Sequence, residues 1–311
     1  MYEAKQLVFY TCVSPVHMGA GSAVGAIDNP IQREVHTEYP LIAGSGLKGA
    51  VRHHFARSWG EGSKALIARL FGPEKDASDH AGAIAFTDAA LVAFPVRSLK
   101  NTYVYATSPT ALGRLKRLAA GTTPGAAPWA VPSVPEGGAL LASSGALSNN
   151  RLVLEAFDFA GEVNEGVTAI ALWLAKHSLP AGDEHKFFRD KLAADLVVLS
   201  DTEFSHFVRH ATVVEAHVRI DDKSGTASDG GLFYTENLPP ETVLAGLVMA
   251  SVERRKSGAN ADGLMNAQQV IDAVLKDDGN RVGLTDHLLQ VGGDATTGRG
   301  LIVVHSAVHN A

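Results

Sequence analysis

The chain has 311 residues, of which 46% are apolar and 19% charged, a composition typical of ordinary globular proteins. Its formal net charge of -6 argues against coating of nucleic acid by bulk electrostatics, so any RNA surface must be a local basic patch. The single cysteine, Cys12, excludes an intramolecular disulfide and a cysteine-cluster metal site. No signal peptide is recognisable and no apolar stretch reaches the roughly 18 residues that span a bilayer, so we expect a cytoplasmic protein.

The first third of the chain predicts a strand, a long loop and two helices. Residues 5–13 are rich in Leu, Val, Phe and Tyr, as expected of a buried strand, and 15–30 form a loop with glycines and two prolines. A turn then leads into a helix within 41–58, for which Ser45 is the expected N-cap. A second helix over 62–71 should stop at the following Gly-Pro pair.

Later segments mix strands and helices without a regular alternation, which favours an α+β fold. The predicted elements are strands at 83–87, 91–97 and 151–155, helices at 109–119, 184–198 and 265–276, a long hairpin at 211–235 and a final strand after residue 300. Between them, the Gly- and Pro-rich residues 121–138 are expected to form an exposed connection.

The segment GSGLKGAVR at 44–52 has the features of a phosphate-binding surface. Three glycines let the backbone approach a ligand, and the start of the following helix favours anions. Lys48 and Arg52 are four residues apart and so share a face; with Arg33 and Arg57 they form the local basic patch. Ala50 stands where a Walker A loop requires lysine. An ordinary solvated first turn remains an alternative.

Two residues of the loop, His17 and Asp28, have chemistry suited to RNA cleavage. Asp28 precedes an Asn-Pro turn, and its carboxylate could hold a divalent cation or act as a base beside a 2′-hydroxyl. His17 could act as an acid or base near neutral pH. A turn-capping aspartate and a hydrogen-bonded loop histidine are the simpler interpretations of the same residues.

Two further segments carry cations toward possible ligands. The 211–235 hairpin displays His217 and Arg219 in alternation with apolar residues, either as a finger against nucleic acid or as a half-buried surface hairpin. The glycine-rich turn at 291–304 carries Arg299 and leads into the last strand, where tight packing is the simpler explanation of its glycines.

The order of these motifs resembles the RAMP superfamily, in particular the nuclease-backbone subunit of type III-B CRISPR (Cmr) effector complexes. The resemblance rests on P-x-H-x-G at 15–19, ID-x-PIQRE-x-HT at 27–37, P-x-I-x-GSGLKG-x-x-R at 40–52, DGGLFYTENLPPET at 229–242 and GGDATTGRG at 292–300. These pieces reach nearly from end to end of the chain. The glycine-rich pieces also occur in the corresponding type III-A subunit.

This resemblance implies a modified ferredoxin-like, RRM-related RAMP core with helical insertions and a protruding β-hairpin thumb. The whole chain, 1–311, would be a single domain, with the thumb at about 211–237 as an insertion. Copies would stack as a filament along one CRISPR guide RNA, together with other Cmr subunits. Each thumb would interrupt the guide–target duplex, and single-stranded target RNA would be cut beside each interruption.

The resemblance also implies roles for individual residues. Asp28 matches the essential catalytic aspartate and would hold a transient divalent ion, Mg or Mn, while His17 lines the same loop. Glu236 lies near positions implicated in cleavage, although TENLP departs from the acidic and aromatic pattern of the family. The residues expected to contact RNA are Arg33, Ser45, Lys48, Arg52, His217, Arg219 and Arg299.

Three other functions remain open from the sequence. A non-catalytic guide-RNA scaffold would use the same surfaces without chemistry at Asp28. The type III-A backbone nuclease subunit shares the glycine-rich pieces. A metabolic enzyme that binds a free nucleotide is disfavoured, because Walker A and Rossmann patterns are missing.

Overall fold

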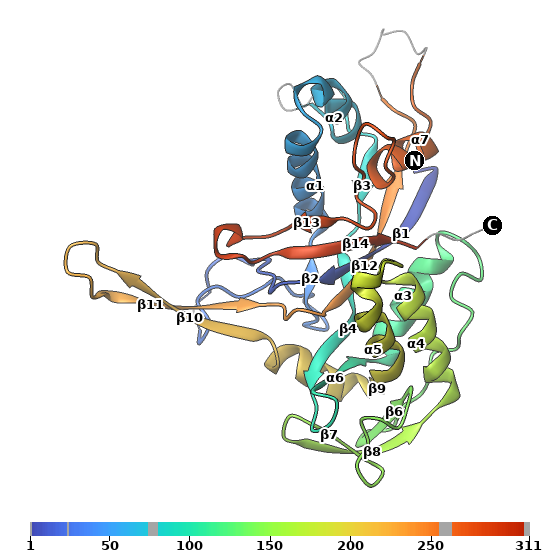
Figure 1. Ribbon diagram of the computed structural model, residues 1–311, viewed down its shortest axis with the longest axis vertical. Coiled ribbons are helices and arrows are strands. Elements are labelled where there is room, and N and C mark those ends of the chain that lie inside the picture. The colour runs from blue at the N-terminus through green and yellow to red at the C-terminus, as the bar shows by residue number, and fades with distance from the viewer. Residues whose placement is uncertain (1, 24, 74–79, 255–262, 308–311) are drawn as a thin grey trace.

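The computed structural model describes residues 2–23, 25–73, 80–254 and 263–307, and shows a large mixed sheet with helices on both faces (Figure 1). The helices are α1 (Gly44–Ser58), α2 (Lys64–Phe71), α3 (Pro109–Ala120), α4 (Glu165–His177), α5 (Lys186–Asp195), α6 (Asp201–His210) and α7 (Ala267–Leu275). The strands are β1 (Ala4–Cys12), β2 (Leu41–Ile42), β3 (Ile84–Phe86), β4 (Ala89–Arg97), β5 (Tyr103–Thr107), β6 (Gly138–Leu141), β7 (Arg151–Leu154), β8 (Phe157–Val163), β9 (Leu196–Leu199), β10 (Val213–Ile220), β11 (Ala227–Asn237), β12 (Val243–Ala250), β13 (Leu288–Gln290) and β14 (Leu301–Ser306). Within the described ranges, no helix has the length and apolar character needed to cross a membrane.

The sheet has an antiparallel centre in the order β14-β1-β12-β4. In the chain, α1 lies between β1 and β4, and α7 lies between β12 and β14. Neither pair of strands is adjacent in the sheet, so each helix belongs to a crossover connection. Beyond β4 the sheet continues through β5, β9, β6, β8 and β7, in the part of the chain that also carries α3 to α6. The α+β prediction therefore agrees with the observed mixed fold.

Strand β1 shows why the sequence there is a continuous apolar run. Its side chains alternate between the two faces of the sheet, and helices cover both. Leu7 and Phe9 pack in a cluster with residues of α3 and α4, whereas Val8, Tyr10 and Cys12 pack with residues of α1 and α7. A strand buried on both faces needs apolar residues at every position. The buried Cys12 fits the small core residue that its surroundings indicate.

The hairpin β10–β11 forms a sheet of its own and projects from the body as a long arm (Figure 1). Strands β10 and β11 pair from Val213 opposite Asn237 to Ile220 opposite Ala227, with a register shift between Val218 and Ile220. Asp221 closes the turn at the tip, where its carboxylate accepts the backbone N–H groups of Lys223 and Ser224. The predicted hairpin is thus present at nearly the predicted residues.

One predicted connection and three helices differ from expectation. The helix expected at 184–198 ends at Asp195, and Leu196–Leu199 form strand β9 instead. Residues 121–138 are not merely an exposed link, because Trp129 is buried against Trp173 of α4, with the ring centroids 5.7 Å apart in an edge-to-face arrangement. Helices α4 and α6 were not expected. Ser200 starts α6 with a capping box that includes Glu203, a local signal that favours a helix at this position.

A buried ion pair connects α2 to the segment after β12. Both carboxylate oxygens of Glu253 accept from Arg69, at 2.5 and 2.6 Å, and one also accepts the backbone N–H of Met265 at 3.1 Å. The Glu253 side chain is fully buried, whereas that of Arg69 is 35% exposed. Removal of the carboxylate therefore leaves a half-buried cation without its main partner.

We expect Glu253→Ala to lower the free energy of unfolding by about 3 kcal/mol, at the low end for a broken buried pair because Arg69 is partly solvated. Thermal unfolding of the two proteins measures the difference. Asp158→Ala is the matched control: it breaks the exposed Arg151–Asp158 pair and should have little effect, because solvent screens both charges. Equal losses in the two variants would contradict this account of the Glu253 pair.

Candidate functional site at the root of the hairpin

The long loop between β1 and β2 lies against the root of the β10–β11 hairpin. Val16 bridges to Leu238, and Asn29 pairs with Thr235 in the parallel sense. Asn29 donates its N–H to Tyr234 O at 3.0 Å and accepts from Glu236 N at 3.0 Å. Backbone pairing of this kind fixes a loop whose glycine-rich sequence would otherwise leave it free.

Asp28 is half-buried and is held by the hairpin itself. Its Oδ2 atom accepts the backbone N–H of Tyr234 at 2.7 Å. Its other oxygen accepts no hydrogen bond from the residues that the structure describes, so one lone-pair direction remains for a ligand. The carboxylate is therefore anchored by one oxygen and available through the other.

His17 is placed by the same strand and by the glycine turn before β14. Its Nδ1 lies 2.7 Å from Glu236 O, and because a carbonyl only accepts, Nδ1 carries a proton, which in the neutral ring leaves the lone pair on Nε2. Gly293 N donates to His17 O at 2.9 Å. Gly292 has φ +74°, and a Cβ there would lie 2.2 Å from His17 O, so this position requires glycine. The two glycines thus let the turn close over His17.

Glu236 is buried and fully paired, which does not support the catalytic role predicted for it. Its side chain is 4% exposed. It accepts from Arg33 Nη2 at 2.5 Å, from Thr212 Oγ1 at 2.8 Å and from Ile31 N at 3.0 Å. A carboxylate with three donors and almost no exposed surface joins three parts of the protein, and its assigned part in cleavage stays a prediction.

Arg33 is correspondingly a structural cation and not part of an open basic patch. Besides Glu236, its guanidinium donates to Val208 O of α6 at 2.9 Å and to Glu38 O at 2.8 Å. Its side chain is 20% exposed. The guanidinium of Arg33 is thus engaged within the protein, and its contact with RNA stays a prediction.

The three other predicted cations of this region differ in their surroundings. Arg299 pairs with Glu215 of β10 at 2.5 Å and so ties the glycine turn to the hairpin. His217 stacks on Phe233 of β11, with ring centroids 5.1 Å apart. Arg219 is exposed near the hairpin tip and remains a candidate RNA contact. Charge pairing reduces the expected contribution of Arg299 to RNA binding.

The start of α1 differs from the prediction in its cap. The N-cap is Ala43, not Ser45, and no side chain of the cap residue bonds the helix. Instead Gly44 N donates to Asp88 Oδ1 at 2.8 Å. A Cβ on Gly44 would lie 2.3 Å from Phe86 O, so glycine is needed where α1 meets the end of β3. Ser45 is exposed, but Asp88 already supplies a negative charge at this helix end.

Lys48 and Arg52 lie on a different side of α1 from a groove lined by Gly46, Ala50 and His53 of the same helix. Both are half-buried, and burial, followed by the charge of Arg52, lowers the pKa of Lys48. Arg52 lines a smaller hollow beside Lys64, at the start of α2. Their contact with guide phosphates stays a prediction. Such a contact would be made on the side of α1 that faces away from the groove.

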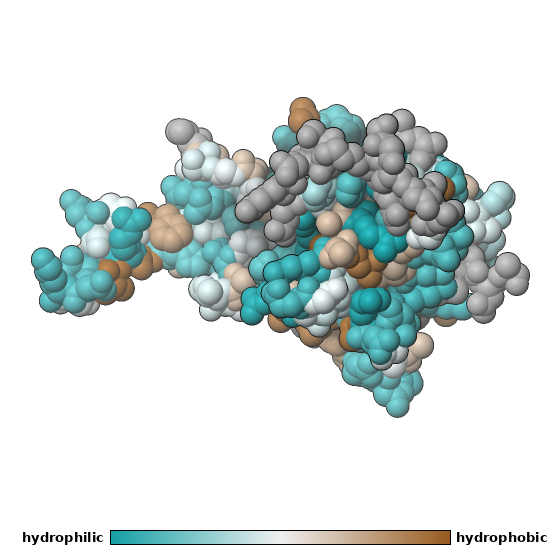
Figure 2. Space-filling view, turned by 90° about the horizontal axis from the view of Figure 1, so that it is seen from above, coloured by the Kyte–Doolittle hydropathy of each residue, from teal (hydrophilic) through white to brown (hydrophobic). Residues whose placement is uncertain are grey.

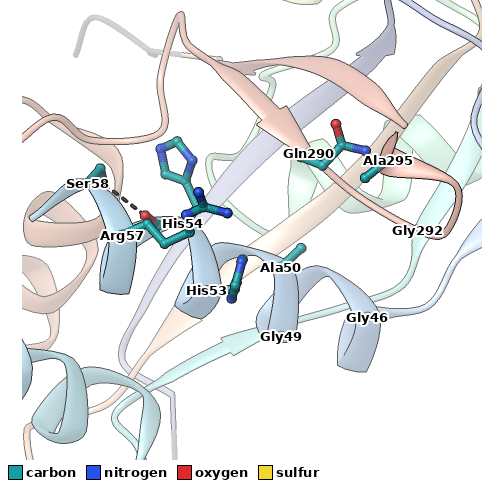
Figure 3. Close-up of a pocket in the computed structure, with 10 residues that line it drawn as sticks. All are labelled: Gly46, Gly49, Ala50, His53, His54, Arg57, Ser58, Gln290, Gly292 and Ala295. Carbon is teal, nitrogen blue, oxygen red and sulfur yellow. Dashed lines mark hydrogen bonds between the residues drawn. The ribbon is translucent and has the colours of Figure 1, made fainter. Parts of the chain in front are cut away.

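The large groove lies between α1 and the turn that joins β13 to β14 (Figure 3). Its volume is about 790 Å³. Its lining residues are Gly46, Gly49, Ala50, His53, His54, Arg57, Ser58, Gln290, Gly292 and Ala295. Burial, with smaller contributions from His287 and His53, lowers the pKa of His54. Small residues on both walls and imidazole and guanidinium groups at one end would accept a nucleotide.

One wall of this groove has a signal in the sequence. His53 and Arg57 follow Gly46, Gly49 and Ala50 at helical spacing, so they fall on one face of α1. The opposite wall comes from residues 290–295, more than 230 positions away in the chain. Only the fold brings the two walls together, so the local sequence pattern of α1 does not predict the groove.

One face of the projecting hairpin is apolar. Opposed and alternate residues of the two strands share a face, on which four large apolar side chains are exposed: Val214 and Val218 of β10, and Leu232 and Tyr234 of β11. Figure 2 shows hydrophobic residues along the arm and hydrophilic ones at its tip. An exposed apolar row on a soluble protein usually marks a binding surface. The Asp28 loop lies at its root.

The divalent ion expected at Asp28 can be compared with the side chains around it. Among the residues with described positions, no three His, Cys, Asp or Glu side chains come together as a ligand set. Mg²⁺, however, is commonly held by one or two carboxylates together with substrate phosphates and waters. The available oxygen of Asp28 meets that requirement only when a polynucleotide supplies the other ligands.

The fold and the hairpin-root site define the class of this protein. The model of the RAMP superfamily matches residues 9–303, and the chain belongs to that superfamily. It is 29% identical over 304 residues to the CRISPR system Cmr endoribonuclease Cmr4 of Pyrococcus furiosus, which covers 97% of this chain and 95% of that protein. The resemblance to the type III-B subunit is confirmed.

A solved structure extends this comparison, and a second relative matches only locally. The crystal structure of oligomeric Cmr4 from Pyrococcus furiosus superimposes with a TM-score of 0.70 at 26% identity, and covers 98% of this chain and 99% of that one. The CRISPR system Cms endoribonuclease Csm3 of Streptococcus thermophilus is 36% identical over 86 residues, but this covers only 24% of this chain. The likeness to Csm3 is thus local, whereas that to Cmr4 extends over the whole chain.

Proposed function

We propose that this chain is the backbone subunit of a type III-B CRISPR complex, which binds guide RNA and cuts complementary target RNA. The observation that carries the proposal is the anchoring of Asp28 at the root of a projecting apolar hairpin. This arrangement occurs in a chain that is similar over its full length to a protein named as a Cmr endoribonuclease. A hairpin that displaces a nucleotide and a carboxylate at its root together form a cleavage site.

The finer features of the fold follow the same proposal. The order β14-β1-β12-β4, with α1 and α7 in the crossovers, corresponds to a ferredoxin-like core. The β10–β11 hairpin is then the thumb, and the strands from β5 to β9 with α3 to α6 are insertions. Copies of the chain stack along one guide, with other Cmr subunits at the ends of the filament.

Guide RNA lies over α1 and the glycine turn. The groove supplies His53, His54 and Arg57, and Lys48 and Arg52 add positive charge on a neighbouring face. One such patch is weak on a chain with a net charge of -6. Stacked copies on one RNA add their contacts, because each bound copy raises the effective concentration of the next.

Cleavage follows from the position of the hairpin. Its apolar face wedges the duplex and turns one target nucleotide out of the A-form stack, so that a 2′-oxygen can line up with the adjacent phosphorus. The 2′-oxygen attacks that phosphorus, the bond to the 5′-oxygen of the next nucleotide breaks, and a 2′,3′-cyclic phosphate and a 5′-hydroxyl form. Correct alignment alone can supply several kcal/mol of the barrier.

Asp28 and His17 supply the remaining chemistry from this chain. The available oxygen of Asp28 accepts the 2′-hydroxyl proton or contributes to a divalent ion, Mg or Mn, which would neutralise phosphate charge. Because Nδ1 of His17 is committed to Glu236 O, only Nε2 can exchange a proton with the RNA. A non-catalytic scaffold is the alternative function, and it predicts cleavage that is independent of Asp28.

Reconstitution of the complex tests the proposal through metal removal. We expect the complex, assembled with guide RNA, to cut a complementary target at regular intervals in Mg²⁺ and to stop when EDTA is added. Target binding should persist in EDTA, because base pairing with the guide supplies it. Uncut target in Mg²⁺, with guide and target both bound, would favour the scaffold function; cutting in EDTA would contradict the metal dependence.

A further inference from the structure

Three segments that are far apart in the chain meet at the Arg33–Glu236 pair. Arg33 belongs to the loop that carries Asp28, Glu236 belongs to β11 of the hairpin, and the Val208 carbonyl that Arg33 also binds belongs to α6. The pair is thus a junction of the loop, the hairpin and the body. We call this set of contacts the Arg33–Glu236 latch.

We propose that the Arg33–Glu236 latch positions Asp28 for cleavage, so that Glu236 and Arg33 are positioning residues and neither contacts RNA. The inference rests on the proposed function, in which Asp28 takes part in the chemistry. Both residues then affect the reaction only through the position of Asp28.

The latch holds the loop on the C-terminal side of Asp28. Glu236 Oε2 accepts the N–H of Ile31, three residues after Asp28, at 3.0 Å. Ile31 itself is buried, and Gly19 bridges to it from the other arm of the loop. With Ile31 fixed to β11, the backbone of Asp28 has little freedom to move away from the hairpin.

Strand β11 holds both ends of the short segment from Asp28 to Ile31. Tyr234 N holds the Asp28 carboxylate at 2.7 Å, and Glu236, two residues further along β11, holds Ile31 N. A movement of the hairpin therefore carries Asp28 with it. The carboxylate stays in register with whichever nucleotide the apolar face displaces.

The chemistry of Arg33 suits a junction of this kind. Its planar guanidinium donates through Nη2 to Glu236 and through Nη1 to two backbone carbonyls, those of Val208 and Glu38. A lysine carries the same charge on a single nitrogen and cannot span these acceptors with the same fixed geometry. The latch should therefore be sensitive to Arg33→Lys even though the charge is retained.

The test compares assembled complexes under single-turnover conditions with saturating target RNA. We expect Glu236→Gln and Arg33→Lys each to slow cleavage by roughly 10-fold to 100-fold, as displacement of a reacting group by about 1 Å does. Target affinity should stay within twofold of the parent, and cuts mapped to single nucleotides should spread to neighbouring phosphates. Arg151→Lys, in an exposed arginine–carboxylate pair far along the chain, is the matched control and should change none of these.

The readouts separate positioning from loss of folded protein. A variant that merely folds less well lowers the fraction of target cut but leaves the rate constant and the cut positions of the active fraction unchanged; that result would overturn the latch. Arg33→Lys serves as the second variant if Glu236→Gln does not assemble. Asp28→Asn is measured alongside: if it still cuts, the proposed function fails, whereas if it is inactive and both latch variants cut normally, only the latch is overturned.

Discussion

Replacement of Asp28 by asparagine is expected to slow target cleavage by roughly 1,000-fold, within the range for loss of an acid–base group or metal ligand. Asparagine retains the size of the side chain and an oxygen that can accept from Tyr234 N. The loop should therefore stay docked on β11 while the negative charge is lost. Single-turnover cleavage by the assembled complex measures the effect.

Binding measurements on the same complex make this result specific to chemistry. Guide content and target affinity should match those of the parent, because Asp28 lies on the hairpin root and not on the α1 groove. Asp183→Asn, an exposed acid at the start of a short 3-10 turn, controls for the loss of one negative charge. Cleavage by Asp28→Asn at a rate near that of this control would leave the scaffold function as the better account.

Shortening the hairpin should have the second largest effect. Val218 and Leu232 are directly paired, so residues 219–231 can be replaced by an Asn-Gly turn without disturbing the remaining ladder. The root contacts through Tyr234, Glu236 and Glu215 are retained. We expect cleavage to slow about 100-fold because no nucleotide is displaced into line with Asp28.

A milder change tests whether the apolar face is what displaces the nucleotide. Val218→Ser combined with Leu232→Ser keeps the length of the arm and removes exposed apolar surface from it. An intermediate loss of rate, with target affinity preserved, is expected. Parent-like rates in both the shortened and the serine variants would show that the arm has no part in the cleavage step.

The regular elements followed from the sequence where local signals were strong. Strand β1, helices α1, α2, α3 and α7, and the β10–β11 hairpin lie within a few residues of their predicted positions, because apolar periodicity and glycine or proline breaks act over short distances. Helix α4 is largely buried and amphipathic only in part, so its pattern is weak. The cap of α1 was missed because Asp88, 44 residues away, takes the place of a local cap.

The site was only partly predictable, for the same physical reason. Motif order placed Asp28 and His17 in one loop, and the structure brings both onto β11. Arg33 and Glu236 looked like an RNA contact and a catalytic acid, because a sequence shows charge but not the partner that neutralises it. Here the partners are 203 residues apart, and only the fold joins them. The residues of the α1 groove were missed because its second wall comes from the far end of the chain.

A structure of the assembled complex, with guide RNA and a target carrying a 2′-deoxy nucleotide at one cut position, tests the central claim. We expect the hairpin to separate that nucleotide from its stack, with the Asp28 carboxylate about 3 Å from the ribose C2′ region or from the scissile phosphate, directly or through one water or metal ion. If the scissile phosphate instead lies beside the α1 groove, with Asp28 still bound to Tyr234 and out of reach, Asp28 is not the residue on which cleavage depends.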